Sequence, residues 1–264
     1  MEHDNEESLA STTRVQAILC GILITILAGA WFGRFVRYTR PPSEEVAPAV
    51  KAYIDRAVYR ALRDPVGRRN FALFGNGGRV VPDLTVILSP DGQISHASEA
   101  LLKRADYAIT DDLRVGQCWS IPGSAAQLGL RLSELMHPTH VSIDHIPAEI
   151  AARIDEAPRA MILWGAIDGS VNESIAEYAN YSIPGLRGRS QPPHTCGHTY
   201  IPLATFEYDI RAPSHVQTFK IEQHLIDAGV YTGVVVLEIV GNWGGSSTCL
   251  YRVRVHGEIL IPVV

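Results

Sequence analysis

The sequence has little charge and no concentration of basic residues. It carries 23 lysines and arginines against 28 aspartates and glutamates, which gives a net charge of −5. A protein that binds nucleic acid needs clustered positive charge to meet the phosphate backbone. The composition therefore argues against a nucleic-acid partner, while 46% hydrophobic residues favour one sizeable globular domain with appendages.

Sequence patterns of known catalytic sites are also lacking. There is no Gly-x-Ser-x-Gly, and the glycine turn at 75–78 lacks the lysine and following helix of a phosphate loop. His145 follows a strand-like run, where a lone histidine is more often structural than catalytic. We expect no catalytic residue, and hence no enzyme.

A possible metal site lies in "HTCGHT", where His194, Cys196 and His198 are two residues apart. Zinc sites use longer spacings and a fourth ligand, and no second Cys/His pair follows at a fitting distance. The favoured interpretation is a surface loop whose Cys196 is free or pairs between chains.

Cysteine is scarce, with four in the chain. Cys20 lies in a long apolar segment, so a disulfide in an oxidising compartment would use two of Cys118, Cys196 and Cys249. Spacing alone does not choose between the pairs.

That apolar segment is the longest in the sequence. Residues 15–36 contain one charged residue, Arg34. About 20 apolar residues in a helix cross a bilayer core. The segment therefore predicts one transmembrane helix, with residues 1–14 as a short tail. A cleaved signal peptide is disfavoured because the preceding region is acidic.

The sequence gives conflicting evidence on the orientation of this helix in the membrane. Three arginines lie at its C-terminal end and only Arg14 precedes it, which predicts that the larger part of the chain is cytosolic. Asn172 and Asn180, each in an Asn-x-Ser triplet, are glycosylation acceptors that predict a lumenal location instead.

Residues 41–67 form a predicted linker and short helical stem. Pro41 and Pro42 break the chain, and residues 44–63 predict a helix. Its apolar residues follow heptad spacing, but a helix this short is marginal alone. The helix either packs on its own domain or acts as a coiled-coil-like stem. The apolar residues at heptad spacing are Val50, Ile54, Ala57 and Ala61.

From Phe71 onward, short strand-like apolar runs alternate with Gly, Pro, Ser and Asp; examples are "LGLRLSEL", "HVSIDHI" and, at 218–226, "TFKIEQHLI". This is typical of an all-β sandwich or barrel with little helix, for example at 97–104. Residues 168–199 form one long irregular insertion. Near the end, Cys249, Tyr251 and Val253 alternate with charged residues, which predicts a half-buried strand with the cysteine on its buried face.

Several segments resemble the SUN-domain family. The closest is the terminal "NWGGSSTCLYRVRVHGE", which follows the family's ending almost residue for residue. The others are "GQCWSIPGSAAQLGLRLSELMHPTHVSIDHIP", "EAPRAMILWG", "TFEYD" and, more loosely, "NFALFGNGGRVV". The resemblance covers roughly residues 70–258 and implies a SUN domain over 70–264.

The resemblance implies a function without catalysis. SUN proteins are β-sandwich homotrimers on a helical stem, anchored by a single pass in the inner nuclear membrane and facing the perinuclear space. They bind the C-terminal tails of KASH-type proteins in the LINC bridge of the nuclear envelope. This favours the lumenal orientation. The alternatives are a SUN-like endoplasmic reticulum protein that assists membrane-protein folding, and a membrane-anchored carbohydrate-binding sandwich.

The resemblance also implies a cation site and a disulfide, because this sequence has residues at the matching positions. Cys118 and Cys249 match a disulfide pair that pins a loop holding a monovalent cation, typically potassium. Backbone carbonyls supply the ligands, and carbonyl oxygens suit a hard cation. The matching positions here are Tyr107, Thr110, Asp112, Gln117 and Tyr251.

The family's pocket for the partner's terminal carboxylate is only partly retained. His145 and Tyr251 match pocket residues, but Glu156 replaces the usual serine and is expected to repel a carboxylate. Ser247 stands where tyrosine is usual, in a turn one residue shorter. The stretch 80–93 has no counterpart of the cysteine that links SUN proteins to their partners, so we expect weaker, non-covalent binding or an unusual tail.

Overall fold

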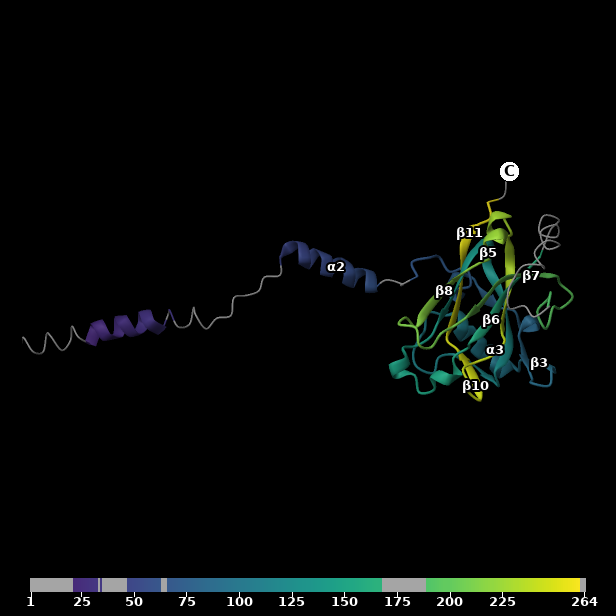
Figure 1. Ribbon diagram of the computed structural model, residues 1–264, viewed down its shortest axis with the longest axis horizontal. Coiled ribbons are helices and arrows are strands. Elements are labelled where there is room, and N and C mark those ends of the chain that lie inside the picture. The colour runs from purple at the N-terminus through teal and green to yellow at the C-terminus, as the bar shows by residue number, and fades with distance from the viewer. Residues whose placement is uncertain (1–20, 33, 35–46, 63–65, 168–188, 262–264) are drawn as a thin grey trace, which may run out of the picture. The chain divides into compact units, whose positions relative to one another are not determined.

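The computed structural model describes residues 21–32, 34, 47–62, 66–167 and 189–261. The chain divides into two units, residues 1–62 and 63–264 (Figure 1). The glycosylation acceptors Asn172 and Asn180 lie outside the described residues.

The described part of the first unit is helical. Residues 21–32 form a helix, and α2 runs from Pro48 to Leu62. Pro48 is tolerated at the start of α2 because the first N–H groups of a helix have no intrahelical acceptor. In the described ranges we find no helix long and apolar enough to cross a membrane. The predicted transmembrane segment, 15–36, lies partly outside those ranges and stays a prediction.

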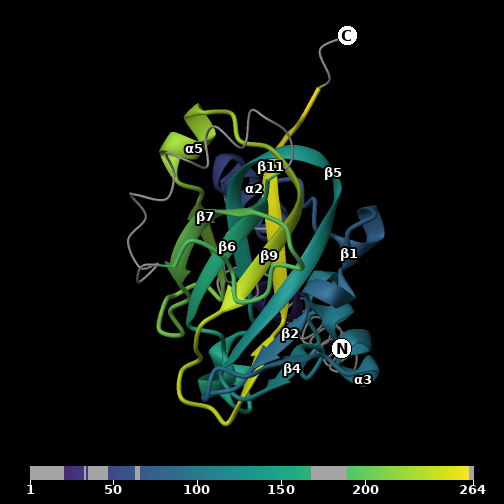
Figure 2. The same cartoon turned by 90° about the vertical axis from the view of Figure 1, so that its right-hand side faces the viewer.

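The second unit is built around one long strand, β5, and is an all-β, sandwich-like domain as the sequence predicts. β5 spans Ala125–Asp144 and curves through the domain (Figure 2). Its first half pairs with β1, β2 and β9, and its second half with β8 and β11. Neighbouring strands along the main path of this sheet follow the order β3-β2-β5-β9-β6-β7.

The other strands are short and antiparallel to their neighbours. The described residues form β1 (Arg79–Val80), β2 (Val86–Leu88), β3 (Ile94–His96), β4 (Trp119–Pro122), β6 (Ala160–Ala166), β7 (Tyr200–Glu207), β8 (Val216–Lys220), β9 (Thr232–Ile239), β10 (Ser247–Leu250) and β11 (Arg252–Ile259). Two short helices accompany them, α3 (Glu99–Ala105) and α5 (Gln223–Asp227).

β5 joins two runs that the sequence suggests as separate strands. Pro138 lies between them and lacks an N–H for the ladder. The structure accommodates it opposite Gly257, where the register with β11 shifts. A bulge is the place at which a sheet tolerates a proline, so the strand continues to Asp144.

One predicted strand is half helix. The run 218–226 divides into the end of β8 and the helix α5. Ile221, which precedes α5, and Leu225 within it are both buried.

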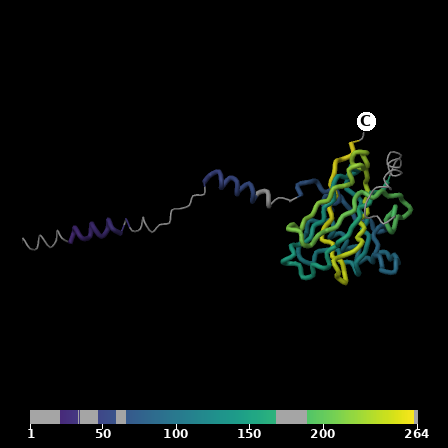
Figure 3. Tube along the Cα trace, in the orientation of Figure 1, coloured from purple at the N-terminus to yellow at the C-terminus, as the bar shows by residue number. Residues whose placement is uncertain are grey.

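The C-terminal strand differs most from expectation. Figure 3 traces it, in yellow, through the domain. Val253 and Val255 are buried, but Arg254 and His256 on the opposite face are also almost completely buried. The predicted half-buried strand is therefore wrong on its polar side: β11 is enclosed on both faces, and its charged residues find partners inside the domain.

Candidate functional site

A disulfide ties the end of the chain to the start of the sandwich. Cys118 directly precedes β4 and Cys249 lies in β10, and these two strands pair with each other, Leu250 opposite Trp119. The bond joins residues 131 apart in sequence, with 5.5 Å between the Cα atoms. The pairing implied by the family resemblance is thus the one present in the structure.

Tyr251 lies next to the disulfide, at the break between β10 and β11. Cys118, Cys249, Tyr251 and Ile146 form a small buried cluster of their own. The Tyr251 hydroxyl accepts a hydrogen bond from the Gly116 N–H at 3.1 Å. Tyr251 therefore connects the loop before Cys118 to the C-terminal strand.

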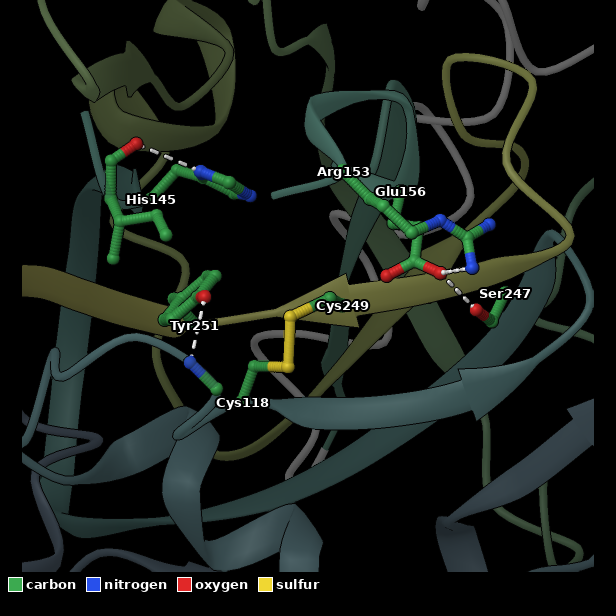
Figure 4. The surroundings of a disulfide bond; sticks show 9 residues. Cys118, His145, Arg153, Glu156, Ser247, Cys249 and Tyr251 are labelled. Atoms are coloured by element: carbon green, nitrogen blue, oxygen red, sulfur yellow. Dashed lines mark hydrogen bonds and ion pairs between the residues drawn. A yellow bond between two sulfur atoms is a disulfide. The ribbon is translucent and has the colours of Figure 1, made fainter. Parts of the chain in front are cut away.

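His145 packs edge-on against Tyr251, with 4.7 Å between the ring centroids (Figure 4). It is 2% exposed and follows directly on β5. Its Nδ1 lies 2.9 Å from the Ile146 carbonyl oxygen, to which it donates. Burial lowers the pKa of His145, a shift that this hydrogen bond opposes and nearby His215 adds to. The imidazole is therefore neutral at neutral pH.

These residues line a pocket of about 250 Å³. It lies between the disulfide, the segment after β5 and the C-terminal end of α3. Three of the predicted partner-binding residues, His145, Glu156 and Tyr251, line it together with two arginines. Its other lining residues are Arg104, Val115, Gly116, Cys118, Ser120, Ile146, Ala151, Ala152, Arg153 and Cys249.

Glu156 is paired within the protein. Arg153 Nη1 lies 2.8 Å from Glu156 Oε1, and the Ser247 hydroxyl donates to the same oxygen (Figure 4). The negative charge that the sequence places in the pocket is therefore balanced by Arg153. Sequence reasoning missed Arg153, although its position three residues before Glu156 was a visible signal.

The turn before Cys249 holds this arrangement together. The Asn242 side chain donates to the carbonyls of Gly245 and Ser247, each at 2.9 Å. A Cβ on Gly245 would lie 2.9 Å from Glu156 Cγ, so only glycine lets the turn approach Glu156 this closely. The short turn thus brings Ser247 to Glu156, although Ser247 does not itself line the pocket.

The predicted cation loop folds against the same site. The Tyr107 carbonyl accepts hydrogen bonds from the N–H and hydroxyl of Thr110, at 3.3 and 3.1 Å. The Asp112 carboxylate accepts from the Arg114 N–H and Nε, at 3.1 and 2.8 Å, and Gln117 directly precedes Cys118. The loop is thus held by its own hydrogen bonds and by the contact of Gly116 with Tyr251. Potassium binding by its carbonyls stays a prediction.

Cys196 is a free, exposed thiol. Its Sγ lies 3.2 Å from His194 Nε2 and donates to the Asp83 carbonyl oxygen at 3.2 Å. Burial raises the pKa of the Cys196 thiol, and Asp83 adds to the shift. Across the described ranges, no three His, Cys, Asp or Glu side chains are grouped to hold a metal ion.

Comparisons with known proteins match most of the second unit. Residues 99–181 and 190–259 match the Sad1 / UNC-like C-terminal family. Human SUN domain-containing protein 1 is 26% identical over 266 residues, which covers 92% of this chain and 30% of that protein. Human SUN domain-containing protein 3 is 29% identical over 58% of this chain and 35% of that protein.

A third relative is the nuclear migration and anchoring protein unc-84 of Caenorhabditis elegans, 24% identical over 80% of this chain and 17% of that protein. The chain thus spans between 17% and 35% of the length of these three relatives. Among solved structures, the family 32 carbohydrate-binding module from Streptococcus pneumoniae EndoD aligns with a TM-score of 0.44 at 10% identity, over 72% of this chain and 100% of that one. A similarity this low says nothing of a ligand.

Proposed function

The chain belongs to the Sad1/UNC-like SUN-domain family, and on this premise we propose that it binds the C-terminal tail of a KASH-type protein as one half of a LINC-type nuclear envelope bridge. The observation that supports this most directly is the pocket beside the Cys118–Cys249 disulfide. The proposed role is binding, and no residue of the pocket is assigned a catalytic part.

The pocket's chemistry fits the end of a peptide chain. Two arginines, Arg104 and Arg153, line it together with a single carboxylate, that of Glu156, while His145 is neutral. Guanidinium groups bind carboxylates through paired N–H donors. The aromatic edges of His145 and Tyr251 provide an apolar wall for the residue that carries the carboxylate.

The rest of the chain fits a membrane-bound linker. The apolar segment 15–36 would anchor the protein in the inner nuclear membrane by a single pass, with the SUN domain in the perinuclear space. α2, only 15 residues long, spans about 22 Å at 1.5 Å per residue. The domain would therefore sit near its own membrane, as a homotrimer on this stem with potassium in the 107–117 loop, and the partner would supply the reach.

The proposal is tested by capture of partners from nuclear envelope membranes. The epitope-tagged full chain is immunoprecipitated at near-physiological potassium, and retained proteins are identified by mass spectrometry. We expect a protein with a KASH-type C-terminus, and a nuclear-rim pattern for the tagged chain. Retention of no such protein, together with a reticular pattern, would favour the endoplasmic reticulum alternative.

A further inference from the structure

We infer that Glu156 is a built-in occupant of the pocket's carboxylate-binding position, which it holds until the terminal carboxylate of a partner peptide replaces it. The contact is autoinhibitory: it sets the affinity of the site and does not abolish binding. This inference rests on the proposed function, because it assigns the ligand class and the regulation of the same pocket.

The geometry shows one carboxylate oxygen held by two donors. Arg153 Nη1 and the Ser247 hydroxyl both bind Glu156 Oε1 (Figure 4). A guanidinium group and a hydroxyl group that donate to the same oxygen suit the binding of a carboxylate ligand. In this chain the ligand position is filled by a side chain of the protein itself.

Each donor also makes a contact that does not involve Glu156. The other Arg153 nitrogen, Nη2, donates to the Ser246 hydroxyl at 3.1 Å. Ser247 is fixed by the Asn242 side chain, which donates to its carbonyl oxygen at 2.9 Å. Each donor is thus also held by a contact that does not involve Glu156, and of the two it is Arg153 that lines the pocket and meets an incoming carboxylate.

Glu156 can be displaced because its ion pair is partly open to water. The Arg153 side chain is 50% exposed and that of Glu156 is 17% exposed. Ion pairs with this much exposure change equilibria by no more than about fivefold. A peptide carboxylate that also packs against Tyr251 and His145, and that lies near Arg104, can compete with such a contact.

The experiment measures binding of N-acetyl-L-leucine, with N-acetyl-L-leucinamide as the uncharged probe, to the full chain by ligand-observed NMR titration. The variants are E156Q, which retains an acceptor for Ser247, E156S, which removes it, and R153M. D209N and R211M are matched controls, because Asp209 and Arg211 form an exposed pair outside the pocket. Thermal unfolding of each variant checks that it folds.

We expect E156Q and E156S to bind the carboxylate probe about fivefold more tightly than the original chain. R153M should weaken binding of the carboxylate probe up to about fivefold, alone and in combination with E156Q, and the controls should change affinity by less than about twofold. The leucinamide should show no such pattern. Unchanged affinity in both Glu156 variants, undiminished affinity in R153M, or no carboxylate binding by any variant would overturn the inference.

The outcome is separable from that of the proposed function. If no KASH-type protein is captured but the probe follows this pattern, the Glu156 contact stands and the partner is another peptide with a free carboxylate. If a KASH-type protein is captured and neither Glu156 variant gains affinity, the inference falls and the proposed function remains.

Discussion

Asp144, the last residue of β5, and Arg254, near the middle of β11, form an ion pair whose side chains are 0% and 2% exposed. Arg254 Nε lies 3.1 and 3.0 Å from the two Asp144 oxygens. Arg252, directly opposite Asp144 in the ladder, binds the same carboxylate and also Asp111. Two arginines and two aspartates therefore balance one another where the 107–117 loop meets the sheet.

Replacing Asp144 with alanine should destabilise the domain strongly, because it leaves two arginines without their buried partner. Removing one partner of a buried pair typically costs about 3–5 kcal/mol of unfolding free energy. Urea unfolding followed by tryptophan fluorescence measures this. The control D209N, at an exposed pair, should cost far less, because water screens exposed ion pairs; similar losses in both variants would contradict the assignment.

The double variant C118S/C249S should lower the unfolding free energy by about 2–5 kcal/mol, since the disulfide closes a long loop in the unfolded chain. C196S is the matched control, because Cys196 is exposed and free, and it should leave the denaturation midpoint unchanged. A midpoint for the double variant equal to that of the original chain would show that the bond does not stabilise the fold.

G257A should destabilise the domain by about 2–3 kcal/mol, because the added methyl forces the packed backbone to shift. A Cβ at Gly257 would lie 1.9 Å from the His137 carbonyl oxygen, whereas one at Gly241 meets nothing within 4 Å. G241A is therefore the control, with an expected change below about 0.5 kcal/mol. Differential scanning calorimetry measures the melting temperatures of the two variants. Equal melting temperatures would refute the argument that the bulge at Gly257 requires glycine.

Stability should fall as the pH drops below about 6.5, the ordinary pKa of histidine. Burial lowers the pKa of His145 in the folded protein, so the unfolded chain binds its proton first. The loss therefore begins near the unfolded pKa and continues down to the folded one. H145N should flatten the pH dependence of the urea midpoint between pH 7 and 5. Burial also lowers the pKa of His140, which accounts for any pH dependence that remains in H145N. If H145N has the same pH dependence as the original chain, His145 does not cause the loss of stability.

A lumenal second unit should carry glycans at Asn172 and Asn180. Expression in cultured eukaryotic cells should give a band whose mobility increases after treatment with a glycosidase that removes N-linked glycans. The single variants N172Q and N180Q should each remove part of the shift, and the double variant all of it. A band unaffected by the enzyme would leave the orientation resting on family membership alone.

The strand pattern was largely visible in the sequence because short apolar runs between turn residues have few alternative structures. The partner of Cys118 was not decided by spacing, and the family's terminal segment was needed to choose Cys249. Arg153 was overlooked because an arginine near a turn is usually solvated. Its side chain also binds Ser246, which lies 93 positions away in the chain and comes close to it through the turn at Asn242–Ser247.

The all-β domain, the family and three pocket residues, His145, Glu156 and Tyr251, could be predicted from the sequence, because local periodicity and a long specific segment carry that information. The environment of the polar face of the last strand could not, because it depends on how distant strands pack. The alternating pattern of a strand does not show whether its charged face contacts water or other parts of the protein. Here Arg254 binds Asp144 and His256 binds Ser142, both of β5, inside the domain. In the same way, only folding converts Glu156 from an unpaired charge into the partner of Arg153.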